Sequence, residues 1–210
     1  MTVAEATTDL TGSLPDRPLR LVGAGAPVDR ARVEEAVREL LAALGRDTTD
    51  EHLRDTPRRV ADAYAELLTP RTFSLTTFPN DEGYDELVLA KGIPFHSLCR
   101  HHLLPFTGVA HVGYLPGERI IGLSELARVV EMLASAVLTP QRLPAQLAIW
   151  LQEHLAPVGV GVVVAAEHLC TSLHGVQADG ARAVTSAFHG VLRRDPRSRA
   201  ELLALTGARR

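Results

Sequence analysis

Two stretches near the start of the chain show the three- and four-residue spacing of apolar side chains that is typical of an amphipathic helix. The first begins at Arg30 and ends at Gly45, a residue type that often follows the last helical turn. The second has Thr56 as N-cap and Pro57 as its first helical residue, and it ends before Pro70. The pattern predicts a pair of scaffold helices with solvated polar faces. Their apolar positions are Val33, Val37, Leu40, Leu41, Leu44, Val60, Ala61, Tyr64, Leu67 and Leu68.

The remainder of the chain mixes strands with helices. A turn is expected at Pro116 and Gly117, and Ser124 is expected to cap a helix whose apolar stripe runs to Val137. Further helices are expected from about residue 139 to 155 and over 196–206. Runs rich in apolar and β-branched residues predict strands at 86–96, 108–115, 120–121, 158–167 and 181–193.

The chain divides into three regions on these patterns. Residues 1–29 combine Thr, Gly, Pro and Ala without helical or strand period, so we interpret them as a flexible N-terminal arm. Residues 30–92 hold the helical pair and a connection, and residues 93–210 form the expected core.

Composition and charge narrow the class of protein. With 46% hydrophobic and 22% charged residues in 210, the chain suits one globular domain with small additions. The longest apolar run, at 158–166, is too short to cross a bilayer, and the acidic N-terminal segment is unlike a secretory signal, so we expect a cytoplasmic protein that spans no membrane. A net charge of -3 gives no basic surface for nucleic acid.

Cysteine and histidine gather in two short motifs. Cys99 begins the run Cys-Arg-His-His that ends at His102, and Cys170 closes the run Glu-His-Leu-Cys. Thiolate and imidazole are ligands that zinc prefers, and three protein ligands leave the open position of a catalytic site. The alternative is a disulfide between the two cysteines, which the reducing cytoplasm disfavours. We therefore predict zinc on Cys99, His102 and Cys170.

Two histidines beside these ligands are candidates for proton transfer. His168 stands two residues before Cys170, so a strand that continued through both would place them on the same face, next to the metal. His101 is the other candidate. Both imidazoles suit general acid or base catalysis near neutral pH.

Residues 32–205 resemble the GTP cyclohydrolase I family. The phrases that carry the resemblance, in family order, are TPRRVADAY, GIPFHSLCRHHLLPF, AHVGYLP, GLSELARVVE, QRLPAQ, AEHLC and AVTSAFHGVL. The resemblance implies an α+β fold of the tunnelling type, in which an antiparallel sheet and a helical layer, with an N-terminal helical pair, assemble into rings, typically a decamer of two pentamers. It also implies zinc on Cys99, His102 and Cys170 and catalytic roles for His101 and His168. The implied reaction opens the guanine imidazole ring with loss of formate and closes a pterin ring.

Several positions depart from the family pattern around the expected substrate. Arg100 stands where the family has glutamate, and Gln141 replaces a glutamate that grips guanine. An amide offers one acceptor and one donor group where a carboxylate accepts two N–H bonds, so we expect guanine recognition to change. At the expected triphosphate site, Asp62, Glu125 and His174 replace family cations, whereas Ser124 and Arg128 remain. Taken as solvated or helix-terminal charges, Asp62 and Glu125 would instead carry no functional meaning.

From these residues we expect a zinc-dependent hydrolase that cleaves a C–N bond of a small heterocyclic substrate, with altered guanine and triphosphate contacts and little activity on GTP. The expected substrate-binding residues are Arg100, Ser124, Arg128, Gln141 and His174. A first alternative is a genuine GTP cyclohydrolase I that makes dihydroneopterin triphosphate for folate or pterin synthesis. A second alternative is a non-catalytic ring protein that binds a pterin or a partner, which the open metal site disfavours.

Overall fold

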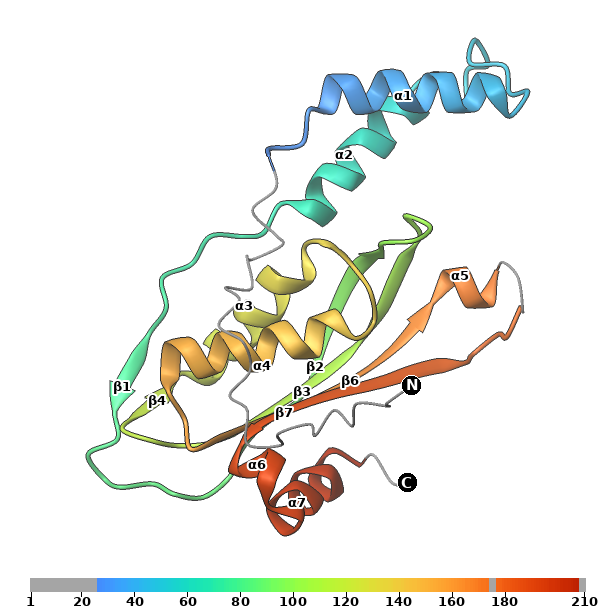
Figure 1. Ribbon diagram of the computed structural model, residues 1–210. Helices are drawn as coiled ribbons and strands as arrows, with labels where there is room; N and C mark the ends of the chain where they lie inside the picture. The colour runs from blue at the N-terminus through green and yellow to red at the C-terminus, as the bar shows by residue number, and fades with distance from the viewer. Residues whose placement is uncertain (1–25, 174–176, 208–210) are drawn as a thin grey trace, which may run out of the picture.

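The computed structural model describes residues 26–173 and 177–207 (Figure 1), so the expected arm lies almost entirely outside the described residues. The chain begins with α1 (Arg30–Ala43) and α2 (Thr56–Leu68), which pack together beyond one end of the sheet. The Asp29 side chain accepts a hydrogen bond from the backbone N–H of Arg32, and Gly45 adopts a φ of 70° just after α1. Helix α2 differs from the prediction at its start, because its N-cap is Asp55 and Thr56 is already helical.

Within the described residues, five strands form one sheet in the order β5-β2-β3-β6-β7. Neighbouring strands are antiparallel except β5, which runs parallel to β2. The expected boundary between residues 92 and 93 falls inside β2. The strands are β5 (Val137–Leu138), β2 (Val88–Cys99), β3 (Pro105–Leu115), β6 (Gly159–His168) and β7 (Arg182–Gly190), and a separate pair joins β1 (Thr77–Pro79) to β4 (Arg119–Ile121).

Helices α3 (Leu123–Ala134) and α4 (Arg142–Leu155) cover one face of this sheet (Figure 1). The predicted cap at Ser124 is wrong, because Gly122 occupies the N-cap position and Ser124 lies in the first turn. The prediction that this helix extends to Val137 is also wrong, because Val137 pairs with Leu98 as part of β5. The residues of β6 that face the helices are buried, and they are Val160, Val162, Val164, Ala166 and His168.

The opposite face of the sheet is partly covered by the C-terminal helices α6 (Val191–Arg194) and α7 (Pro196–Thr206). Gly113 of β3 and Gly161 of β6 are direct cross-strand partners. A Cβ atom on either glycine would lie 2.6 Å from Cδ1 of Leu202, so the missing side chains make room for this fully buried leucine of α7. The helix bounds agree with the prediction for 196–206.

Three neighbouring strands start or stop at the same end of the sheet: β2 ends at Cys99, β3 begins at Pro105 and β6 ends at His168. Because β3 is antiparallel to both β2 and β6, residues that are far apart in sequence lie close together at this end of the sheet. After His168 the chain turns into the short helix α5 (Leu169–Ser172). The strand therefore does not continue through Cys170, and the condition for placing His168 and Cys170 on one strand face is not met. Among the described residues, no helix is both long and apolar enough to cross a membrane.

Candidate metal centre

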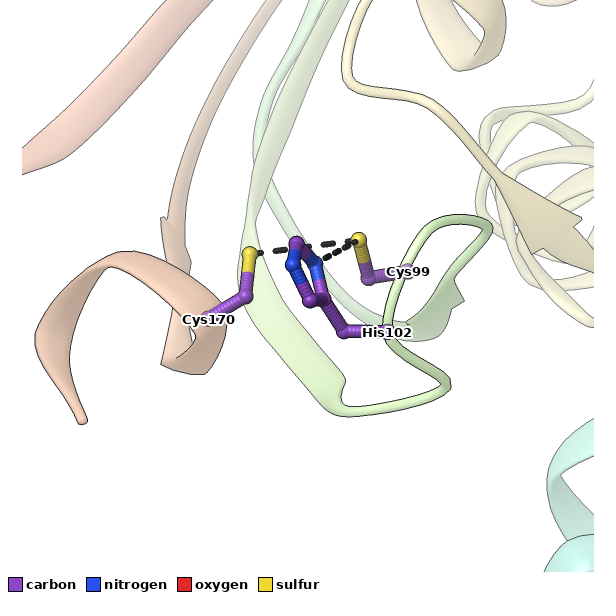
Figure 2. A group of neighbouring side chains, drawn as sticks. All are labelled: Cys99, His102 and Cys170. Carbon is purple, nitrogen blue, oxygen red and sulfur yellow. Dashed lines mark hydrogen bonds between the residues drawn. The ribbon is translucent and has the colours of Figure 1, made fainter. Parts of the chain in front are cut away.

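The side chains of Cys99, His102 and Cys170 converge at the end of the sheet where β2 and β6 stop (Figure 2). Sγ of Cys99 lies 3.8 Å from Nδ1 of His102 and 3.9 Å from Sγ of Cys170. The three donor atoms all lie within 4.8 Å of one another. Cys99 is buried, Cys170 is half-buried and His102 is exposed. The structure therefore brings together the three residues that the sequence assigns to zinc.

A tight turn after β2 carries His102 back toward Cys99. The backbone N–H of Leu103 donates to the carbonyl of Cys99, and the N–H of Cys99 donates to the carbonyl of Leu104, both at 2.8 Å. Leu103 adopts a φ of 55°, in the left-handed region that a non-glycine residue seldom occupies. This turn holds the His102 side chain close to Cys99, so the Cys-x-x-His segment can bind a metal ion through both residues.

Two of the three donor separations are close to those around a tetrahedral zinc ion. Zinc bonds of about 2.3 Å to sulfur and about 2.0 Å to nitrogen correspond to donor separations of roughly 3.5 to 3.8 Å. The observed separations of 3.8 and 3.9 Å need little adjustment to reach this range. Burial, together with the neighbouring Cys99, raises the pKa of the Cys170 thiol, so the thiolate is disfavoured in the free protein. A bound dication would stabilise the thiolate and reverse this effect.

His168 lies in the buried stripe of β6, and its side chain has a specific environment. Its imidazole stacks on the ring of Phe106, with ring centroids 4.4 Å apart and an angle of 19° between the ring planes. Burial lowers the pKa of His168, and Nε2 is buried without a hydrogen-bond partner among the described residues. His101 is exposed, and its ring meets that of His102 edge-on at 6.3 Å.

Two of the expected phosphate-binding residues, Ser124 and Arg128, lie on α3. Arg128 lines a cavity of about 860 Å³ that contains none of the three metal ligands. Its guanidinium bonds Glu125 at 3.1 Å, and Glu125 is 4% exposed with its second carboxylate oxygen lacking a partner among the described residues. Asp62 lines the same cavity, and Ser124 is exposed in the first turn of α3.

A backbone hydrogen bond joins Arg100 to the segment that precedes Gln141. The N–H of Arg100 donates to the carbonyl of Leu138, and the chain from Leu138 reaches Gln141 three residues later, just before α4. Both side chains are exposed. His174 lies outside the described residues, so its expected role stays a prediction.

Sequence reasoning missed two features of the site. The first is the stack of Phe106 on His168, which depends on the register of β3 against β6. The second is the hydrogen bonding after β6, where Ser172 donates to the side chain of Glu167 at 3.3 Å. The period of two that links Val160, Val162, Val164 and Ala166 to His168 is a signal that could have indicated the first feature, because it places His168 on the same strand face as these buried residues.

A largely antiparallel sheet beneath a helical layer, with two cysteines and one histidine that could hold zinc where its strands end, fits a zinc-dependent hydrolase. The chain belongs to the GTP cyclohydrolase I family, whose model matches residues 33–207. This match confirms the expected family and the tunnelling type of α+β fold, and with it a zinc-dependent hydrolase that acts on C–N bonds.

Curated relatives extend over most of the chain. A GTP cyclohydrolase 1 of Mycobacteroides abscessus is 52% identical, with 84% of this chain and 89% of that protein covered. The GTP cyclohydrolase 1 of Streptomyces griseus is 48% identical over 91% of this chain and 98% of that protein, and that of Thermoanaerobacter pseudethanolicus is 44% identical over 87% and 100%. Among solved structures, an apo archaeosine synthase QueF-Like has a TM-score of 0.42 at 18% identity, over 50% of this chain and 93% of that one, which is too weak to support an argument.

Proposed function

We propose that this chain catalyses the hydrolytic opening of the guanine imidazole ring of GTP, with loss of formate and closure to dihydroneopterin triphosphate. The observation that carries the proposal is the set of Cys99, His102 and Cys170 donors, in a chain whose relatives at 44 to 52% identity are named GTP cyclohydrolase 1. Those names favour the genuine cyclohydrolase over the divergent hydrolase that we expected from the substituted pocket residues.

The chain's own residues divide the work of this reaction. Cys99, His102 and Cys170 would hold zinc, which when bound polarises water or a carbonyl for attack. His168 would exchange a proton with the ring nitrogen that is released as the C–N bond breaks, because its Nε2 has no competing partner among the described residues. The exposed His101 would serve as the second proton-transfer group.

The direct test is incubation of the zinc-loaded protein with GTP, followed by mass spectrometry for formate loss and for the pterin product. The Cys170→Ala variant is the matched control, because it removes one of the three metal donors and changes a side chain that is only half-buried. We expect formate and pterin from the parent protein and neither from the variant. Equal product from both proteins, or none from a parent with full zinc, would contradict the proposal.

A second candidate is a cyclohydrolase for a substrate that carries less negative charge. It is favoured by the charge pairing around the cavity that Arg128 lines, where each of three lining arginines contacts a carboxylate. The pairs are Arg30 with Asp62 at 3.6 Å, Arg71 with Glu131 at 3.1 Å and Arg128 with Glu125 at 3.1 Å. Cations already paired with carboxylates have less attraction left for a triphosphate.

Parallel assays with guanosine and guanine separate the two candidates. Turnover of GTP with a Michaelis constant in the micromolar range supports the first. Opening of guanosine with weak or absent activity on GTP supports the second. A protein that binds a pterin yet opens none of the three compounds would favour the non-catalytic alternative.

We also propose that the chain forms a ring-shaped homo-oligomer, a decamer of two pentamers. Leu40 of α1 and Leu44, the residue that caps its C-terminus, are 55% and 63% exposed, and α1 contains no buried residue. Val184 is 61% exposed on β7, which ends the sheet within the described residues. Such apolar surface and an open strand edge are typical of subunit contacts. Light scattering that finds a monomer at micromolar concentration would contradict this assembly.

We propose a cytoplasmic location because two thiolate ligands need a reducing compartment to remain reduced. Cys99 and Cys170 are both free thiols with sulfur atoms 3.9 Å apart, close enough for oxidation to compete with zinc binding. Fractionation of cells, with detection of the protein by antibody, tests this location.

A further inference from the structure

The side chain of His168 is packed against Phe106 by the architecture of the sheet. The two residues are direct cross-strand partners on β3 and β6, so their side chains project from the same face at the same level. Phe106 is 2% exposed and His168 is 5% exposed. At 4.4 Å between centroids and 19° between planes, the imidazole lies flat on the phenyl face.

Phe106 is itself held in place from its other side. The ring of Phe95 on β2 meets it edge-on, with centroids 5.9 Å apart and planes at 79°. Because Phe95, Phe106 and His168 come from three adjacent strands, they form a row of aromatic rings across the sheet. A phenyl ring fixed in this way has little freedom to follow a movement of the imidazole.

The backbone of His168 is fixed as well. Its carbonyl accepts a hydrogen bond from the hydroxyl of Thr171 at 2.7 Å, and the hydroxyl of Ser172 shares its proton between this carbonyl and the side chain of Glu167, each at 3.3 Å. With the backbone held, rotation about the side-chain bonds is the remaining freedom of the imidazole. The flat face of Phe106 restricts this rotation.

Nε2 of His168 is buried and has no hydrogen-bond partner among the described residues. A buried polar atom of this kind normally has a partner, so a bound substrate, a water molecule or a second subunit has to supply one. The orientation of the ring decides where that partner must stand.

We propose that Phe106 is a positioning residue that fixes the orientation of the His168 imidazole, so that Nε2 meets the substrate at one place. The kinetic part of this inference rests on the proposed function, in which His168 exchanges a proton. The structural part, the fixed ring orientation, does not.

The kinetic test compares Phe106→Leu with Phe106→Tyr, which keeps the ring, and with Val112→Ala, a buried core change on the same face of β3. We expect Phe106→Leu to lower kcat by about tenfold or more, with KM changed by less than about threefold, because small misplacement of a catalytic group is costly. Phe106→Tyr should recover most of kcat, and Val112→Ala should lose stability without loss of kcat. Zinc content, measured in each variant, should stay at about one per chain.

The structural test observes the imidazole directly by NMR of protein labelled with ¹³C in histidine, with the His168 signal assigned from a His168→Gln variant. The phenyl ring should displace the His168 signal upfield in the parent protein and in Phe106→Tyr, and the displacement should disappear in Phe106→Leu. If Phe106→Leu does not fold, the displaced signal in the parent and its retention in Phe106→Tyr still test the stack.

The results separate this inference from the proposed function. A parent protein inactive on GTP, guanosine and guanine, yet with the displaced signal, refutes the proposed function and leaves the fixed orientation supported. An undisplaced His168 signal in the parent overturns the inference. So does a Phe106→Leu variant that keeps kcat within about twofold of Val112→Ala, or that loses kcat in proportion to its zinc.

Discussion

Replacing Glu125 by glutamine would release Arg128 from a charged partner without removing side-chain volume. Oε1 of Glu125 lies 3.1 Å from the guanidinium, and Oε2 is buried without a partner among the described residues. A carboxylate that is 4% exposed and only half satisfied is costly to bury, so its neutralisation should leave the fold as stable or more stable. The variant therefore tests binding rather than folding.

The size of the effect follows from the geometry of this pair. At 3.1 Å the Coulomb attraction is about 5 kcal/mol for an effective dielectric of about 20. The side chain of Arg128 is 52% exposed, so solvent screening reduces the attraction to about 1 to 2 kcal/mol. A guanidinium freed from this partner can offer the same interaction to a phosphate group. The expected gain in kcat/KM for GTP relative to guanosine is therefore about 5- to 30-fold.

The assay measures kcat/KM for GTP and for guanosine in the parent, in Glu125→Gln and in Glu153→Gln. Glu153 is an exposed carboxylate of α4 outside the cavity, so its variant controls for the change in net charge. The gain should appear for GTP in Glu125→Gln alone, and it should shrink as salt is added. An unchanged ratio of GTP to guanosine, or the same gain in Glu153→Gln, would refute the reasoning.

Four further outcomes are expected. Cys170→Ala should lose zinc and activity together, measured by metal analysis, because two donors hold the ion too weakly, and full zinc occupancy would contradict the assigned site. His168→Ala should keep its zinc and lose about 10² to 10⁴ in rate, whereas parallel loss of zinc would make His168 a ligand. Burial lowers the pKa of His111 and of His189 below the ordinary 6.5, so the native state favours their neutral forms. Their stabilising contribution is complete above about pH 6.5 and is lost as the pH falls through the lowered values, so urea midpoints should drop from pH 7.5 to 5.5, and less so in a His111→Asn, His189→Asn double variant. Gly161→Ala, whose Cβ would lie 2.6 Å from a side chain of α7, should lower the free energy of unfolding by about 1 to 3 kcal/mol in urea titrations, and an unchanged midpoint would show that α7 adapts freely.

The elements that sequence alone predicted well are those with local signals at both ends. Helix α7 begins at Pro196 after the capping Asp195 and ends before Gly207, so composition and spacing define it within a few residues. Strand β5 was missed because Val137 continues the apolar stripe of α3, and only pairing with the distant Leu98 makes it a strand. Long-range pairing of this kind leaves no local pattern.

The candidate site likewise has features that local sequence signals predict and features that depend on contacts formed only in the fold. Cys99, His102 and Cys170 could be named from residue type and spacing, because the chain has only two cysteines and each has a histidine within three residues. The turn into α5 could not be anticipated, because it depends on the hydroxyls of Thr171 and Ser172 bonding one carbonyl. The pairing of Arg128 with Glu125 was equally hidden, since the sequence gives no sign that Glu125 is buried.

The alternation that builds the core also determines the environment of His168. Every second residue of β6 faces the helical layer, and the buried stripe of valine and alanine ends in this one histidine. An apolar residue at the same position would continue the core without leaving a buried nitrogen unpaired. The unpaired nitrogen therefore lowers the stability of the folded protein at the end of the sheet where the metal ligands lie, and a bound substrate that hydrogen-bonds Nε2 would offset this loss. Because that gain arises only on binding, the same feature that weakens the free protein favours the complex.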